Sequence, residues 1–271
     1  MRQIDKKKKM IFAFIFVCIL IVIAIFSEAL APNNPYVTNA ADIRKAPCAQ
    51  YLFGTDNMGR CVLSRVLVGT KLTIASTFFL VGISFIIGTF VGMVCGYYGG
   101  ILDEILMRVA DLMLAFPQMV VAIAVAGILG GGLGGAMIAL GITIWISFAR
   151  LARSHTCSIK NEPYIIVAKL SGKNGMYILF RHILPNIVEP LFINALTQIG
   201  STMIGISGLS FLGLGVVPPQ AEWGSMISEA RAYIQIAPWA VLFPAAATVI
   251  TIVSFNYLGD AVMEYKNADE Y

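Results

Sequence analysis

The chain has 271 residues, of which 58% are hydrophobic and only 13% are charged, and its mean hydropathy is +0.80. Soluble domains average about 25% charged residues, so the composition excludes a soluble protein and indicates an integral membrane protein. The net charge of +4 does not indicate a nucleic-acid surface, because in a membrane protein the placement of lysine and arginine matters more than their sum.

Six apolar runs are long enough to cross a bilayer, which takes about 20 residues of helix. They predict an all-α integral membrane fold with no room for a separate soluble domain. The predicted spans are 10–30, 72–97, 105–129, 136–152, 187–209 and 239–258.

The first third of the chain begins with a basic stretch, 1–9. The first span, 10–30, is longer than the apolar core of a signal peptide, so we expect a retained helix with a cytoplasmic N-terminus. An outer loop, 31–71, follows; it is irregular at its proline-rich start and forms a short amphipathic helix from Met58 onward. The second span then places Gly88, Gly92 and Gly96 on one face, a spacing that lets another helix approach closely in lipid.

The remaining spans belong to a core domain, 72–261. Pro117 predicts a bend in the third span. A long polar loop, 153–185, follows the fourth span, and its central part, 161–185, predicts a surface that docks onto a soluble partner. A second outer loop, 210–238, contains a short amphipathic helix over 221–234, and a cytoplasmic tail, 262–271, ends the chain.

Basic residues set the orientation of these segments. With the N-terminus inside, roughly two thirds of the lysine and arginine residues lie in cytoplasmic segments, as the positive-inside rule requires. The long polar loop is therefore expected in the cytoplasm.

The fifth span has a periodic polar face, and it is the only span in which we find one. Its members recur at steps of four, three and four, so they share one side of a helix. Polar side chains inside a bilayer face other helices or a water-filled cavity. The residues on this face are therefore candidates for lining a translocation path; the alternative is that they form hydrogen bonds between helices. These residues are Asn194, Gln198, Ser201 and Gly205.

Enzyme motifs are missing from the sequence. No span holds paired acids or a His-Glu-x-x-His motif, and Gly172-Lys173 lacks the other residues of a phosphate-binding loop. The chain is therefore expected to bind no metal, cofactor or ATP of its own. The five cysteines show no metal-ligand spacing, and Cys48 and Cys61 are the one pair that could form a disulfide.

Several motifs, in this order, resemble one family. They are LFGTDNMGR before the second span, LMRVADLMLAFP leading into the third, RHILPN at the end of the polar loop, SFLGLGV and AEWGSMI in the second outer loop, and FNYLGDA in the sixth span. Together they are similar to the second permease subunit of bacterial nickel, dipeptide and oligopeptide ABC importers.

This resemblance implies a type I importer fold in the bacterial inner membrane. It also implies a second homologous permease, two ATP-binding subunits that hold ATP and Mg, and an extracytoplasmic substrate-binding protein. In this family the cytoplasmic loop forms a short coupling helix that sits in a cleft of the ATPase. The positions that carry over to this loop are Glu162, Tyr164, Ile166, Val167, Ala168, Lys169, Gly172 and Pro185.

The sequence departs from the family pattern at three positions. Ile166 stands where a glutamate is usual and Val167 where an alanine is usual, so docking is expected to depend on apolar and backbone contacts. Ala168 and Gly172 keep the small side chains that close packing needs. Cys61 stands where an aspartate usually follows Gly-Arg.

The resemblance leaves the substrate open. The sequence of residues 168–172, Ala-Lys-Leu-Ser-Gly, resembles that of nickel permeases more than that of peptide permeases. The main hypothesis is therefore import of nickel, free or chelated. The alternative is import of short peptides. The hypotheses from other classes are an ATP-independent channel or secondary carrier, and a membrane scaffold.

Overall fold

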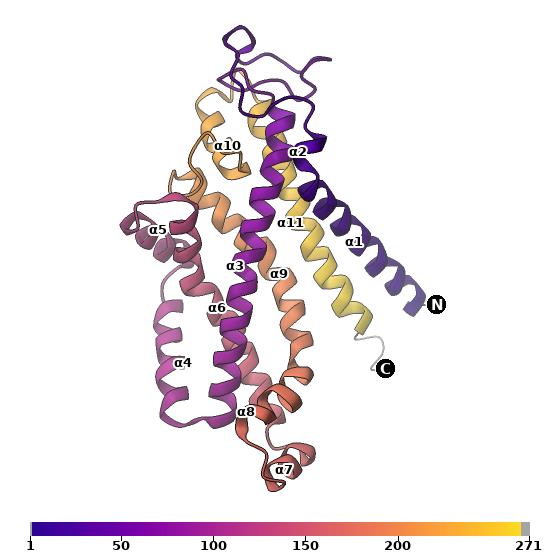
Figure 1. Ribbon diagram of the computed structural model, residues 1–271, viewed down its shortest axis with the longest axis vertical. Helices are drawn as coiled ribbons and strands as arrows, with labels where there is room; N and C mark the ends of the chain where they lie inside the picture. Colours follow the sequence, from indigo (N-terminus) through magenta and orange to yellow (C-terminus); the bar gives the residue numbers. More distant parts are fainter. Residues whose placement is uncertain (1, 267–271) are drawn as a thin grey trace.

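The computed structural model describes residues 2–266, which form helices joined by loops (Figure 1). Five helices are long and apolar enough to cross a membrane, and α4 and α5 together would make a sixth span. The predicted all-α membrane fold is confirmed. The helices are α1 Arg2–Ile25, α2 Ser27–Leu30, α3 Val62–Tyr98, α4 Gly100–Leu114, α5 Gln118–Ile128, α6 Gly132–Ile159, α7 Pro163–Leu170, α8 Gly175–Ile178, α9 Leu184–Phe211, α10 Trp223–Ala230 and α11 Trp239–Lys266. Two short 3₁₀ turns, η1 Ala40–Asp42 and η3 Arg231–Tyr233, and one π-helical turn, η2 Leu179–Ile183, complete the set.

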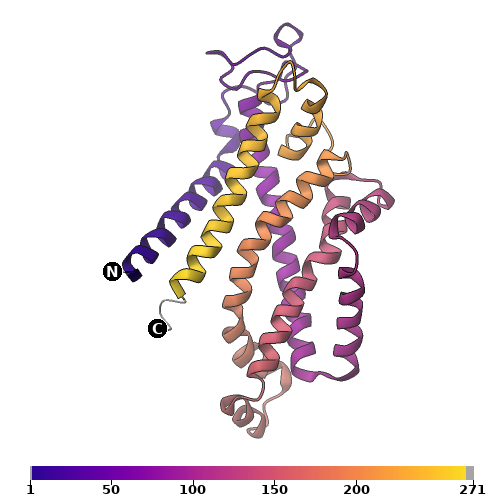
Figure 2. The same cartoon turned by 180° about the vertical axis from the view of Figure 1, so that it is seen from behind.

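The bundle has two distinct ends. Helices α7 and α8 lie at one end, and the loop 31–61 and α10 lie at the other (Figures 1 and 2). The basic polar loop contains α7 and α8, so we call their end the inner end and the opposite end the outer end. Both α1 and α11 point their free termini toward the inner end, as an even number of crossings requires.

The central contact of the bundle is a seam between α3 and α6. A Cβ atom built on Gly88 would lie 2.3 Å from the carbonyl oxygen of Trp145, and one on Gly92 would lie 2.2 Å from the carbonyl oxygen of Ala149. Gly96 continues the row one turn further along α3. The two backbones touch because glycine has no side chain there, which confirms the close approach predicted from the glycine spacing.

The third span is broken rather than bent. Helices α4 and α5 meet at an angle of 92°, so α5 lies across the bundle instead of continuing α4 (Figure 1). Pro117 has no N–H to donate to the preceding turn, and its own carbonyl oxygen accepts from the Val120 amide at 2.9 Å to begin the new helix. The position predicted for the bend is confirmed, but the angle is far larger than that of a kinked span.

Several helices extend beyond their predicted ends, and α3, α6 and α11 change the predicted loop boundaries. Helix α3 begins at Val62, so the amphipathic segment and the second span are one helix and the outer loop ends before residue 71. Helix α6 continues to Ile159 and α11 to Lys266, so the polar loop and the tail begin later than residues 153 and 262. No helix breaker stands at these junctions. The tail residues 267–271 lie outside the described residues.

At about 1.5 Å per residue, α3 is about 55 Å long, well over the hydrocarbon thickness of about 30 Å. Its outer turns therefore leave the membrane and support the outer loops. There, Gly69 packs against the Trp223 ring, where an added Cβ would lie 3.2 Å from the nearest ring atom. The indole N–H of Trp223 donates to the Val66 carbonyl oxygen at 3.0 Å.

Helix α10 closes the outer end. It is shorter than the helix predicted over 221–234, because the chain tightens into the 3₁₀ turn η3 after Ala230. The buried carboxylate of Glu222 caps its start and accepts from the amides of Gly224 and Ser225 at 2.9 and 2.8 Å. An acidic side chain at a helix start satisfies free amides and complements the helix dipole.

A buried ionic cluster joins the first outer loop to α3 and α10. Arg60 donates to Asp56 and to Glu229, each at 2.6 Å. Arg65 lies 3.6 Å from both carboxylates and donates to the Pro219 carbonyl oxygen at 3.3 Å. Two arginines and two carboxylates balance in charge, which allows their burial.

All five cysteines, which lie within the described residues, are free. The disulfide that the sequence left open between Cys48 and Cys61 is therefore not formed.

Candidate translocation and coupling sites

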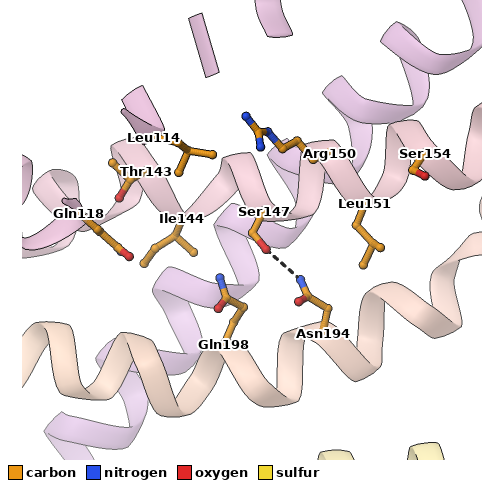
Figure 3. Close-up of a pocket in the computed structure, with 10 residues that line it drawn as sticks. All are labelled: Leu114, Gln118, Thr143, Ile144, Ser147, Arg150, Leu151, Ser154, Asn194 and Gln198. Atoms are coloured by element: carbon orange, nitrogen blue, oxygen red, sulfur yellow. Dashed lines mark hydrogen bonds between the residues drawn. The ribbon is translucent and has the colours of Figure 1, made fainter. Parts of the chain in front are cut away.

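A cavity of about 520 Å³ opens between α6 and α9, with the break between α4 and α5 at its side (Figure 3). Its walls combine hydroxyl and amide groups with a few aliphatic side chains and one guanidinium group. The residues that line it are Leu114, Gln118, Thr143, Ile144, Ser147, Arg150, Leu151, Ser154, Asn194 and Gln198.

The α6 wall of this cavity is a second periodic polar face. Thr143, Ser147, Arg150 and Ser154 recur at steps of four, three and four, the same spacing as the polar face predicted on the fifth span. The inference that only the fifth span has such a face was wrong. The signal is present in the sequence, but its last two members, Arg150 and Ser154, lie at and beyond the expected end of the fourth span, 136–152, where basic residues also indicate topology.

The α9 wall contains two of the four residues predicted for the path. The Asn194 side-chain amide donates to the Ser147 hydroxyl at 3.3 Å across the cavity (Figure 3). Ser201 lies one turn beyond Gln198 and donates to its side-chain oxygen at 3.0 Å. Asn194 therefore lines the cavity and also bonds α9 to α6, and its role in a translocation path stays a prediction.

Gly205, the fourth predicted residue, is placed differently. It is buried, and a Cβ built on it would lie 3.1 Å from the Leu140 side chain. Its small size lets α9 pack against α6 above the cavity, so the structure assigns it to helix packing rather than to the cavity lining.

Two ion pairs join α6 to α4 along the cavity side. Arg150 pairs with Asp111, and both side chains are largely exposed. One turn toward the inner end, Arg153 binds Asp103 through two nitrogen–oxygen contacts of 2.5 and 2.6 Å. This second pair is more buried and is fork-to-fork, a geometry that fixes orientation as well as adding energy.

A neighbouring cavity of about 660 Å³ lies nearer the inner end, between α6, α9 and α11. It shares Leu151 and Asn194 with the first cavity, so these two side chains form the wall between the two spaces. Glu189 and Lys266 form an ion pair at its edge. The α6–α9 seam is therefore hollow along much of its inner half.

The inner tip of the molecule is formed by α7, the helix that contains most of the predicted coupling positions. Glu162 stands at its N-cap, with its carbonyl oxygen accepting from the Ile165 amide at 2.9 Å. Ile165 and Ala168 are buried toward the bundle. The other face is apolar and exposed; it consists of Tyr164, Ile166, Val167 and Leu170, the last of them 83% exposed.

Gly172 ends α7 rather than packing against a partner element of this chain. Its φ of +73° is in the left-handed region, and a Cβ on it would meet no atom within 4 Å. The Lys173 amide donates back to the Ala168 carbonyl oxygen at 3.2 Å, the bond pattern of a glycine-terminated helix. Within this chain Gly172 therefore acts as the stop of α7, and its expected packing against an ATP-binding subunit stays a prediction.

The tip is fastened to the inner end of α3. The Lys169 ammonium lies 4.9 Å from the centre of the Tyr97 ring, close enough for a cation–π contact. Lys160 donates to the Gly96 carbonyl oxygen at 2.9 Å. Pro185 is exposed in the first turn of α9, so it starts the helix that leads from the tip to the cavity.

Comparisons with known proteins give one consistent result. Residues 88–268 match the family described as the binding-protein-dependent transport system inner membrane component. The chain is 38% identical over 263 residues to the dipeptide transport system permease protein of Alkalihalophilus pseudofirmus, covering 97% of this chain and 86% of that protein. It is 41% identical over 266 residues to the glutathione transport system permease protein of an Escherichia coli strain, covering 97% and 87%.

Proposed function

The chain belongs to the family of binding-protein-dependent transport inner membrane components and is a permease subunit of an ABC importer, and from that premise we propose that its cargo is a small peptide. The observation that carries this proposal is that relatives named for dipeptide and for glutathione transport match nearly the whole chain at about 40% identity. Both names describe short peptides.

The cavity chemistry supports a peptide cargo. Its polar groups are hydroxyls, carboxamides and one guanidinium, which hydrogen-bond to amides and carboxylates. Nickel favours imidazole and other nitrogen or sulfur ligands, and the cavity lining has none. The sequence of residues 168–172 favours nickel, but those residues lie at the C-terminal end of α7 and line neither cavity.

We also propose that α7 docks into an ATP-binding subunit. Two such subunits, a second homologous permease and an extracytoplasmic binding protein would complete the importer. The support is the exposed apolar face of α7, with Leu170 the most exposed of its aliphatic side chains. Leu170 would supply an apolar contact with the ATP-binding subunit in place of the glutamate that is missing at position 166.

The cargo is tested by reconstituting the complete importer in proteoliposomes and supplying a dipeptide, glutathione or Ni²⁺ in separate reactions. We expect ATP-dependent uptake of at least one of the two peptides. Uptake of Ni²⁺ without uptake of either peptide would disprove the proposed cargo and restore the nickel hypothesis.

The docking site is tested with Leu170→Ala, with the adjacent Ser171→Ala as the matched control. Truncating a well-packed interface residue costs about 2 kcal/mol or more, so we expect the affinity for the ATPase to fall at least about tenfold for Leu170→Ala and to change little for Ser171→Ala. Equal affinities of the two variants, measured by co-purification of titrated ATPase, would exclude this face of α7 as the docking surface.

A further inference from the structure

Arg150 is the only charged residue among those that line the α6–α9 cavity. The other polar groups there are neutral, so they suit the amide groups of a peptide. Every free linear peptide also has a carboxylate, whatever its side chains. A guanidinium group matches a carboxylate with two parallel hydrogen bonds, which makes Arg150 the one lining group with the right charge and shape.

The present partner of Arg150 is held loosely. The Arg150 and Asp111 side chains are 45% and 66% exposed, and exposed ion pairs contribute little free energy. A second carboxylate could therefore take the place of Asp111 at small cost. Figure 3 shows the guanidinium on the Leu114 side of α6, whereas Ser147 on the same helix points toward the wall that carries Gln198 and Asn194.

A second ion pair between α4 and α6, Arg153 with Asp103, is held more tightly. Arg153 and Asp103 make two short contacts, and the Asp103 side chain is only 15% exposed. Neither residue lines the cavity. The α4–α6 contact therefore already has a tight clamp, so Arg150 is not needed for that purpose.

We propose that Arg150 is a specificity-determining residue that binds the carboxylate of the peptide cargo in the α6–α9 cavity, with Asp111 holding the guanidinium when no cargo is present. This inference rests on the proposed peptide cargo. The Asn194 and Gln198 amides and the Ser147 hydroxyl face the rest of the cargo and hydrogen-bond to its amide groups.

The test compares Arg150→Gln with Asp111→Asn in the complete importer, reconstituted with its binding protein and a dipeptide that the wild type imports. Loss of a charge-assisted hydrogen bond is expected to lower import by Arg150→Gln at least about tenfold. ATP hydrolysis stimulated by loaded binding protein should stay within about twofold of wild type. Asp111→Asn should keep import at or above the wild-type rate, because it removes a competitor for Arg150.

Opposite effects of the two substitutions are the signature of cargo binding. If Arg150 only pairs with Asp111, both substitutions break the same bond and must lower import equally; that result would overturn the proposal, as would unchanged import by Arg150→Gln. Arg150→Lys covers the case in which Arg150→Gln does not assemble. Lysine keeps the charge but loses the two-pronged geometry, so import between wild type and none is expected, and full import would overturn the proposal.

Arg153→Gln is the matched control on the same helix. It breaks the clamp outside the cavity, so we expect ATP hydrolysis and import to fall together. The proposed function is judged separately by the wild type: a wild-type importer that takes up no peptide defeats the peptide cargo, whereas one that does, with Arg150→Gln unaffected, defeats only this inference.

Discussion

Replacing Gly92 by alanine tests whether the α3–α6 seam holds the bundle together. The added methyl group would lie 2.2 Å from the Ala149 carbonyl oxygen, roughly 1 Å closer than ordinary contact, so the two helices must move apart. Overpacking of this kind costs about 1–3 kcal/mol. Helix propensity acts in the other direction, because alanine in a helix interior is favoured over glycine by about 1 kcal/mol.

The same helix offers a matched control at Gly82. A Cβ on Gly82 meets no atom within 4 Å, so Gly82→Ala gains the propensity term without the clash. The difference between the two variants therefore isolates the steric term, and we expect Gly92→Ala to be less stable than Gly82→Ala by about 1–3 kcal/mol.

The assay is thermal inactivation of the purified importer in lipid nanodiscs, followed by intrinsic fluorescence and by the fraction that stays soluble. Gly92→Ala should lose its fold at a lower temperature than wild type, and Gly82→Ala at the same or a higher temperature. If the two variants melt together, the backbone contact between α3 and α6 does not determine stability, and the seam interpretation is refuted.

Three further predictions concern the outer end. Cys61 is the N-cap of α3 and makes no capping hydrogen bond, so Cys61→Ser should stabilise the protein by about 0.5–1 kcal/mol in the same melting assay, while Cys48→Ser should not. Trp223→Phe replaces the buried indole by a smaller phenyl ring and removes the N–H bond to the Val66 carbonyl, and should lower stability by about 1–3 kcal/mol; an unchanged melting temperature would contradict this. Burial raises the pKa of Tyr233 from 10.0 to about 12. As the pH rises, the unfolded chain releases the Tyr233 proton before the folded chain does, so the free energy of unfolding should fall between pH 10 and pH 12. A smaller fall over that window in Tyr233→Phe would verify the assignment.

The sequence predicted the spans well because the signal for a span is local. An uninterrupted apolar run of sufficient length has to cross the bilayer as a helix, and the glycine row on α3 follows directly from helical spacing. Helix ends were predicted less well. Helices α3, α6 and α11 continue past the membrane surface, where hydropathy no longer marks the end and only caps and breakers would.

The angle between α4 and α5 could not be read from the chain. Pro117 identifies where a helix must break, but the angle after the break depends on what the second helix packs against. The buried cluster of Arg60, Arg65 and Glu229 was equally inaccessible, since it joins residues more than 150 positions apart. Gly172 is different, because a glycine two residues after an apolar helix is a local stop signal that the sequence alone carries.

Helix α3 makes contacts at both ends of the molecule. Its inner end contacts the tip through Tyr97 and Lys169, and its outer turns hold Trp223 of the cap. Between these points the glycine seam fixes α3 to α6 by backbone contact, which has no side-chain rotamers to absorb a displacement. Helix α3 therefore links α7 to α6 through contacts along one continuous helix. Because α6 is also one wall of the cavity and α9 the other, α3 connects the inner tip, the cavity wall and α10 at the outer end.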